Sequence, residues 1–413
     1  MTYFTTSKTI ASLTVIVVCL MALQLAGCQS TQQPASSTDD VPGYLQQYAE
    51  QYAQDPRAAS VQWFRDAKLG MFVHYALASV LEGGKPELLR LGEAENVDVS
   101  LLELPVDAMA DAGLTQADIA RHLKFRRDLM DKFDAKNFDA DAIVQLALDT
   151  EMKYITFTTK HLGGMRMYRT SVTDFNSLNA PAVRDLVAEM AEACARKNMG
   201  LFLYVPPETA RTDGEFFETN RTILRELLTQ YGPIAGIWFD GIGKYFNNPE
   251  NYTRLHEQFA FIRSMQPQCL ISFKEGGIEQ EDFISPEHFH MATPIAWENP
   301  KVQERWDIRL ARWKKSSEEA WNRYYHTVPV EINTVMQECN NRDGVGEPGG
   351  WINDENARHL SVEEMMLLVK VAHSQGANLL INIGPRGDGS VHPDDLKTLK
   401  EIGRCIRADG YLE

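Results

Sequence analysis

The feature that most constrains the fold is a regular alternation of short apolar runs with amphipathic segments from about residue 133 to residue 274. Each apolar run has the length of a buried strand, and each amphipathic segment repeats apolar residues at helical spacing. Strands that alternate with helices form βαβ units and a parallel sheet, and this many units favours a closed barrel. The predicted helices are 140–150, 181–197, 215–230 and 250–266, and the predicted strands are 152–158, 199–205, 234–240 and 269–274.

The two ends of the chain complete this pattern. Residues 68–75 predict the first strand, and residues 377–385 predict the last one, with helices at 361–374 and 393–408 on either side. Nothing remains for a second domain, so we predict an α/β fold, an irregular (β/α)8 TIM-type barrel over residues 44–413.

Two parts of this barrel are less regular. From about residue 76 to residue 132 the chain carries many charges and no second strand, which is typical of an elaborated loop after a barrel's first strand. In the region 279–350, residues 290–297 and 328–335 are the candidates for strands six and seven, and a charged helix from about 302 to 325 divides them.

Charge and cysteine content narrow the function. The 413 residues include 41 Lys+Arg and 57 Asp+Glu, a net charge of −16 without any basic run, which argues against nucleic acid as a partner and favours a neutral substrate. Cys194, Cys269, Cys339 and Cys405 are far apart and lack the paired spacing of a metal cage, so we predict no metal and no cofactor. Buried free thiols are the default for these cysteines, although export would permit one disulfide.

The amino terminus differs from the rest of the chain. Residues 10–26 are almost wholly apolar and lead into Leu25-Ala26-Gly27-Cys28, which resembles the bacterial lipobox. We predict a lipoprotein signal peptide at 1–27, lipidation of Cys28 and a flexible tether at 28–43, with a signal anchor as the alternative. Because Gln29 and not Asp follows the cysteine, the resemblance points to an outer-membrane lipoprotein whose domain is periplasmic or surface-facing.

The stretch Ile234-Ala235-Gly236-Ile237-Trp238-Phe239-Asp240-Gly241 indicates where the site lies. An apolar run that ends in a carboxylate and a glycine predicts a buried parallel strand whose last side chain reaches the carboxyl edge of the sheet, where α/β barrels carry their active sites. An aromatic face and a carboxylate at that edge suit a sugar, since the carboxylate can attack an anomeric carbon. The alternative is an Asp that caps a following helix.

A series of motifs in fixed order resembles the α-L-fucosidase family, glycoside hydrolase family twenty-nine, from about Trp63 to Gly410. The motifs are Leu69-Gly70-Met71-Phe72-Val73-His74, Phe138-Asp139, Tyr154-Ile155-Thr156-Phe157-Thr158-Thr159-Lys160-His161, Leu203-Tyr204, Trp238-Phe239-Asp240-Gly241, Asp282-Phe283-Ile284-Ser285-Pro286-Glu287 and Gly376 to Gly389. This resemblance implies a retaining exo-glycosidase that removes terminal α-L-fucose from glycans through a covalent glycosyl-enzyme intermediate. The carboxyl-terminal β-sandwich common in the family has no counterpart here.

The resemblance also implies roles for particular residues. Asp240 would be the nucleophile and Glu287 the general acid/base, with Glu275, Glu279, Glu281 and Asp282 as rivals for the second role. The implied substrate-binding residues are His74, His161, Tyr204, Trp238 and Lys274. The remaining histidines, including His359 and His392, are expected to be structural, and Asn378 and Asn382 are expected to tie strand ends to neighbouring loops.

Four departures from the family pattern lie in its sugar-binding motifs, and the first is Tyr75-Ala76 after His74, where the family has Trp-Gly. Leu162 stands where the family has a second histidine, Glu87-Leu88 stands where it has Glu-Trp, and Lys274 replaces an arginine, keeping the charge but losing the planar fork. Two alternatives therefore stay open. The same barrel and mechanism could act on a different sugar, or the chain could be a catalytically inactive glycan-binding surface lipoprotein.

Overall fold

The computed structural model describes residues 41–102, 104, 106–206, 213–241, 249–274, 278–286, 327–340 and 346–411, together with four isolated positions between 300 and 323. Its main element is an eight-stranded sheet in which all the paired strands are parallel. The strands are β1 (Leu69–Val73), β2 (Tyr154–Thr158), β3 (Gly200–Val205), β4 (Gly236–Phe239), β5 (Leu270–Phe273), β6 (Phe283–Ile284), β7 (Glu331–Val335) and β10 (Asn378–Ile383). Their order in the sheet is β6-β5-β4-β3-β2-β1-β10-β7.

The two strands at the ends of this order meet through a further contact. An isolated parallel bridge joins Ile284, the last residue of β6, to Val330, which directly precedes β7. The amide of Ile284 donates to the carbonyl of Pro329 at 3.2 Å. The sheet therefore curls into a (β/α)8 barrel of the TIM type, as the sequence predicted.

The position predicted for the sixth strand was wrong. That strand is β6 and has only two residues, so it leaves no apolar run long enough to recognise. The segment 290–297, where the strand was expected, lies outside the described residues. The seventh strand, β7, lies within the predicted range 328–335.

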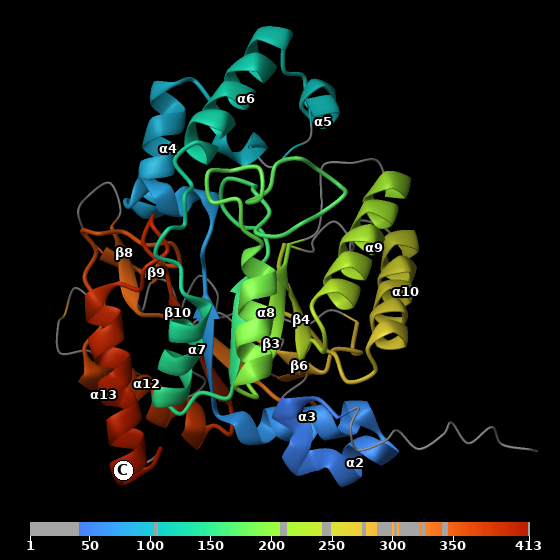
Figure 1. Ribbon diagram of the computed structural model, residues 1–413, viewed down its shortest axis with the longest axis vertical. Helices are drawn as coiled ribbons and strands as arrows, with labels where there is room; N and C mark the ends of the chain where they lie inside the picture. The colour runs from blue at the N-terminus through green and yellow to red at the C-terminus, as the bar shows by residue number, and fades with distance from the viewer. Residues whose placement is uncertain are drawn as a thin grey trace, which may run out of the picture. The chain divides into compact units, whose positions relative to one another are not determined.

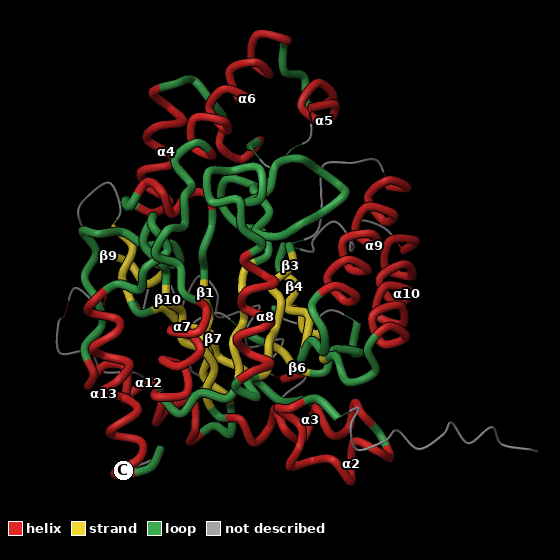
Figure 2. Tube along the Cα trace, in the orientation of Figure 1, coloured by secondary structure: helices red, strands yellow, loops and turns green. Residues whose placement is uncertain are grey.

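Helices surround the strands (Figure 1), and Figure 2 shows the barrel strands gathered inside this layer. The helices that follow the barrel strands are α7 (Ala140–Asp149), α8 (Leu186–Arg196), α9 (Asp213–Gln230), α10 (Pro249–Met265), α12 (Val362–Ser374) and α13 (Pro393–Asp409). Side chains at their first turns explain where several of them begin. Asp139 and Asp185 each accept a backbone N–H of the first turn at 2.9 Å, and Ser361 forms a capping box with Glu364.

The barrel separates two apolar cores. The outer core lies between the strands and the surrounding helices, and the inner core fills the barrel with large rings, including Phe72, Tyr154, Phe202, Trp238 and Phe283. The chain ahead of β1 contributes to the inner core through η2 (Gly43–Tyr48), α2 (Ala49–Gln54) and α3 (Pro56–Ala67). Trp63 of α3 stacks on Phe202 with ring centroids 6.2 Å apart, so α3 closes the amino-terminal end of the barrel.

The described chain begins at Val41, whose side chain is buried in the inner core. Residues 41–43 therefore belong with the barrel, although the barrel domain was predicted to begin at residue 44. Residues 1–40, which include the predicted signal peptide, Cys28 and most of the predicted tether, lie outside the described residues. Among the described residues, no helix is both long enough and apolar enough to cross a membrane.

Two insertions lie at the carboxyl ends of the strands. The segment after β1 is helical, with η3 (Leu77–Leu81), α4 (Gly84–Ala94), η4 (Val99–Leu101), α5 (Val106–Asp111) and α6 (Gln116–Met130), and it lies at the top of Figure 1. His122 in this segment is structural, since its ring bonds the carbonyl of Asp118 and the amide of Asp98. An antiparallel hairpin of β8 (Gln337–Asn340) and β9 (Gly346–Gly350) follows β7.

Three cysteines in the described part of the chain are free thiols, and two of them are fully enclosed by the fold. Cys194 on α8 and Cys269 ahead of β5 are buried, whereas Cys405 on α13 is partly exposed. Burial raises the pKa of both the Cys194 and the Cys269 thiol.

Candidate active site

Six of the residues predicted to form the site come from the carboxyl ends of five neighbouring strands. They are His74 after β1, His161 after β2, Tyr204 in β3, Trp238 in β4, Asp240 after β4 and Lys274 after β5. Because these strands are parallel and adjacent, their carboxyl ends form one edge of the barrel. The predicted acid/base, Glu287, and the predicted lipid site, Cys28, lie outside the described residues.

The rings at this edge form a continuous aromatic cluster. Tyr204 and Trp238 lie on paired positions of β3 and β4 and stack at 5.6 Å with a 25° angle between their planes. His161 lies 5.4 Å from Tyr204, and His74 meets His161 edge to face at 4.8 Å. His74, Tyr204 and Trp238 are buried and His161 is partly exposed. Flat apolar ring faces together with directed nitrogen atoms are the combination that recognises a sugar ring and its hydroxyl groups.

Asp240 is held in a defined orientation beside this cluster. Its Oδ2 accepts a hydrogen bond from the Tyr204 hydroxyl at 2.9 Å, and its Oδ1 accepts the Gly241 amide at 2.8 Å. The Lys274 ammonium lies 3.8 Å from Oδ1. The carboxylate side chain is 31% exposed and that of Lys274 is 21% exposed, so both are within reach of a ligand at the barrel edge. Asp240 is thus an oriented, accessible carboxylate of the kind a covalent glycosidase mechanism needs.

The orientation of His74 follows from a chain of hydrogen bonds. Asn382 on β10 donates its Nδ2 to the carbonyl of Trp351 at 3.0 Å, which leaves its Oδ1 toward His74 Nδ1, 2.5 Å away. An amide oxygen can only accept, so the proton lies on Nδ1 and the Nε2 of a neutral ring is an acceptor.

Both asparagines of β10 act as predicted at the strand ends. Asn378 at the start of β10 donates to the carbonyl of Phe64 at 2.7 Å and accepts the amide of Lys68 at 3.1 Å. Asn382 fixes Trp351 in the loop after β9. The two residues join the first and last strands of the barrel to adjacent loops, and Asn382 reaches the site through His74.

Two of the acids that compete with Glu287 have structural contacts. Asp282 is buried and pairs with Arg57 and Arg263, and it also accepts the amide of Ile271 at 2.8 Å. Glu281 is buried and accepts the amide of Ile278 at 2.9 Å and that of Gln280 at 3.1 Å. These contacts occupy both carboxylates in holding the loop before β6.

Two residues of this region were missed by the sequence analysis. Trp351 packs beside His74 with ring centroids 4.9 Å apart, although the two are far apart in the chain. Glu331, the first residue of β7, is buried and accepts the indole N–H of Trp238 at 3.1 Å. The sequence around Trp351 gave no indication that it lies at the site, since a tryptophan after two glycines is compatible with any loop. Glu331 had one, because an acid between Val330 and Ile332 interrupts an apolar strand.

The departure at position 162 has a structural counterpart. Leu162 packs against the outer apolar core, and its carbonyl accepts the amide of Ala78 at 3.2 Å. The next residue, Gly163, has a positive φ of 96°, and a Cβ there would lie 2.9 Å from the Cβ of Leu77. Position 162 therefore joins the loop after β2 to η3 and offers no polar group to a substrate.

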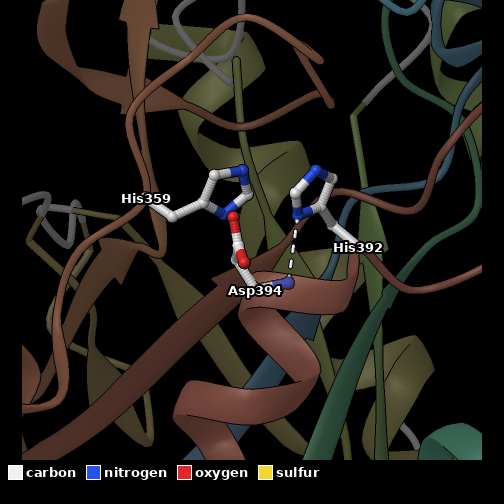
Figure 3. Close-up of side chains that lie close together, drawn as sticks. All are labelled: His359, His392 and Asp394. Carbon is white, nitrogen blue, oxygen red and sulfur yellow. Dashed lines mark hydrogen bonds between the residues drawn. The ribbon is translucent and has the colours of Figure 1, made fainter.

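One cluster away from this edge contains potential metal ligands. His359, His392 and Asp394 have ligand atoms within 4.8 Å of one another (Figure 3). The two imidazoles are stacked at 4.1 Å with 16° between their planes, so their in-plane lone pairs run side by side and do not converge. His359 Nδ1 bonds Asp395 at 2.5 Å, and His392 Nδ1 accepts the Asp394 amide at 3.3 Å as the N-cap of α13. A helix cap and a His–Asp pair account for this group, and we assign no metal to it.

An aromatic cluster with an oriented carboxylate at the carboxyl edge of a TIM-type barrel is the arrangement of a glycoside hydrolase. Residues 40–411 match the family described as Alpha-L-fucosidase. The chain belongs to the α-L-fucosidase family.

Relatives with curated names agree with this family. Alpha-L-fucosidase 1 of Arabidopsis thaliana is 25% identical over 281 residues, which cover 65% of this chain and 52% of the relative. The Plasma alpha-L-fucosidase of Pongo abelii is 23% identical over 377 residues, covering 84% of this chain and 68% of the relative. The chain spans about half the length of the plant relative and 64% of a Putative alpha-L-fucosidase of Caenorhabditis elegans.

Solved structures share the fold. The Alpha-L-fucosidase isoenzyme 1 from Paenibacillus thiaminolyticus aligns with a TM-score of 0.62 at 22% identity, covering 86% of this chain and 77% of that one. Alpha-L-fucosidase AlfC from Lactobacillus casei, in complex with α-L-fucose product, aligns with a TM-score of 0.57 at 20% identity, covering 84% of this chain and 98% of that one. At these identities the likeness concerns the barrel.

The His359–Asp395 pair predicts a pH-dependent contribution to stability. Burial lowers the pKa of His359, but the hydrogen bond and charge of Asp395 outweigh it, so the pKa is raised above its ordinary value. While Asp395 is ionised, the pair therefore stabilises the folded state fully below about pH 6.5 and loses that contribution as the pH rises through the raised pKa of His359. Burial also raises the pKa of Asp395, so protonation of Asp395 ends the contribution at the acid side. We expect Asp395→Asn to lower the free energy of unfolding by about 3 kcal/mol near pH 6 and by less near pH 8, measured by urea unfolding.

The neighbouring exposed residue supplies the control for this comparison. Asp394→Asn makes the same chemical change one residue earlier on α13 and is expected to cost less than about 1 kcal/mol through the helix dipole. An equal loss for the Asp395 variant at both pH values would contradict the charged pair.

Proposed function

We propose that the chain is a retaining exo-α-L-fucosidase that hydrolyses terminal α-L-fucosides of glycans through a covalent glycosyl-enzyme intermediate. Asp240 attacks the anomeric carbon, and Glu287 first protonates the leaving oxygen and then activates water. Retention requires two carboxyl groups roughly 5 Å apart, one ionised and one protonated. His74, His161, Tyr204, Trp238 and Lys274 bind the sugar.

The observation that supports this proposal most is the position of Asp240. It follows β4 directly, its two oxygens are fixed by Tyr204 and Gly241, and it lies beside the ring cluster. Lys274 places a positive charge 3.8 Å from the same carboxylate. In the glycosyl-enzyme this carboxylate becomes an ester and loses its charge, and the Tyr204 hydroxyl and Lys274 remain to stabilise it when it leaves again.

The proposal predicts that Asp240→Ala lowers kcat on 4-nitrophenyl α-L-fucopyranoside by about 10³-fold or more, since the step that forms the intermediate is lost. The structure of an AlfC mutant contains that substrate. Circular dichroism is expected to show an unchanged fold, because the Asp240 side chain is 31% exposed. For the wild-type enzyme, ¹H NMR of the first product is expected to show the α anomer of fucose.

Asp174→Ala is the matched control for Asp240→Ala. Asp174 is an exposed acid on the loop between β2 and α8, and the variant is expected to retain wild-type kcat. Wild-type turnover by the Asp240 variant, or initial release of the β anomer, would refute the assignment.

A second candidate function is the same mechanism on a different sugar. Leu162 favours it, because a position that is polar in the family packs here against the apolar core. The third candidate is a catalytically inactive glycan-binding protein, and Leu162 motivates it as well.

An assay with a panel of aryl glycosides distinguishes these readings. We expect kcat/KM for the α-L-fucoside to exceed that for the other aryl glycosides by at least about 10²-fold, because a site that hydrogen-bonds particular hydroxyl groups rejects a sugar that presents them differently. A clear preference for another glycoside would establish the second candidate. Sugar binding by calorimetry without hydrolysis of any glycoside would establish the third.

We also propose that Cys28 carries the lipid of an outer-membrane lipoprotein whose barrel is periplasmic or surface-facing. The motif Leu25-Ala26-Gly27-Cys28 after an apolar run of export-signal length supports this. We expect Cys28→Ser to move the protein from the membrane fraction to the soluble fraction and to abolish labelling by a clickable palmitate analogue. Cys19→Ser, within the apolar run, is the control and should leave both unchanged. Continued membrane association of the Cys28 variant would favour a signal anchor.

A further inference from the structure

Glu331 lies inside the barrel and contacts β2 and β4, which are not neighbours of its own strand, as well as the end of β6. It opens β7, whose partner in the sheet is β10, yet its carboxyl group meets side chains from β2, from β4 and from the residue after β6. Contacts from so many sides are possible only across the interior. The residue is 1% exposed and is surrounded by the rings of the inner core.

Both oxygens of this carboxyl group have hydrogen-bond donors. Oε1 accepts the Trp238 indole N–H at 3.1 Å and the Ser285 hydroxyl at 2.6 Å, and Oε2 accepts the Tyr154 hydroxyl at 2.5 Å. Burial raises the pKa of Glu331, and the three donors act in the opposite direction. Placing a carboxyl group in an aromatic interior is costly unless its contacts are satisfied, so this arrangement needs a reason beyond packing.

The contacts of Oε1 join the two strand ends on which the proposed chemistry depends. Trp238 lies two residues ahead of Asp240 and stacks on Tyr204, whose hydroxyl donates to Asp240 at 2.9 Å. Ser285 lies two residues ahead of Glu287 in the sequence. One carboxyl oxygen therefore bonds the side chains that precede both proposed catalytic acids by two positions.

A second residue of β7 supports the same connection. Asn333 lies two residues after Glu331, and its Nδ2 donates to the Ser285 carbonyl at 2.7 Å and to its hydroxyl at 3.0 Å. Main chain and side chain of Ser285 are thus both fixed from β7. β7 therefore supports the end of β6, through Glu331 and Asn333.

We propose that Glu331 is a positioning residue that sets the placement of Asp240 relative to the end of β6 through Trp238 and Ser285. The inference rests on the proposed role of Asp240. Glu331 is enclosed and its oxygens are engaged, so it acts through these two side chains and does not touch the substrate. Misplacing a reacting group by about 1 Å costs on the order of 10²-fold in rate, which is the scale of effect expected here.

The test compares two variants of the full chain that differ in hydrogen bonding. In Glu331→Gln the amide oxygen still accepts from Trp238 and Ser285, and we expect kcat and KM on 4-nitrophenyl α-L-fucopyranoside within about 3-fold of wild type. In Glu331→Leu both donors lose their acceptor, and we expect kcat to fall about 10²-fold with KM changed less than about 3-fold. The pH profile of the Gln variant should keep both limbs.

Further variants keep the result open to refutation. Tyr154→Phe removes the donor to Oε2, away from the two strand ends, and should leave kcat unchanged. If Glu331→Leu fails to fold, Ser285→Ala decides: it removes one Oε1 donor without changing charge and should lower kcat about 10-fold at constant KM. Wild-type kcat in the Leu or Ala variant, or a Gln variant as impaired as the Leu variant, would overturn the proposal.

A spectroscopic readout separates this proposal from the proposed function. The chain has seven tryptophans, and Trp238→Phe identifies the Trp238 indole N–H signal in ¹⁵N-labelled protein. That signal should stay in place in Glu331→Gln and move in Glu331→Leu. If the wild-type chain hydrolyses no glycoside, the proposed function fails. A signal that moves only in the Leu variant would still support the placement of Trp238 by Glu331, and an unmoved signal would reject it.

Discussion

The arrangement of this protein depends on filling the inside of a closed barrel with aromatic rings. Phe72, Tyr154, Phe202, Trp238 and Phe283 come from different strands and must interdigitate in one interior, with Trp63 of α3 closing the end. Such packing leaves each ring one orientation. Because Trp238 and Tyr204 belong both to this interior and to the carboxyl edge, packing at the centre of the barrel determines the geometry at the surface where Asp240 lies.

The fold could be predicted where local pattern and tertiary environment agree. The strands β1 to β5 are apolar runs of four to six residues between recognisable helices, and all five lie within or beside the ranges expected from the sequence. β6 could not be predicted in this way, because a strand of only two residues shows no recognisable apolar run. Its pairing is determined by Ser272 and Phe273 of β5 and by Val330, none of which is local to it. A strand defined by its neighbours cannot be found from its own residues.

The site residues likewise fall into those that the sequence could locate and those that it could not. A residue that follows a parallel strand must lie at the carboxyl edge, so the strand-end rule was sufficient to place Asp240 there, whereas His74, Tyr204 and Trp238 were named as site residues through the resemblance to the family. Trp351 reaches the same place through a loop after a hairpin, and no local pattern specifies where such a loop lies. Glu331 was visible as an acid within an apolar strand, but its partners on β2, β4 and β6 follow only from closure of the barrel.

The burial of two cysteines has a consequence for the reactivity of their thiols. Thiol–disulfide exchange requires an accessible thiolate, and the environments of Cys194 and Cys269 offer neither access nor a low pKa. Once the barrel has closed, oxidants have no route to either sulfur. If the chain folds in an oxidising compartment, Cys194 and Cys269 are open to cross-linking only before the helices dock, so fast formation of α8 and β5 would itself protect these two thiols.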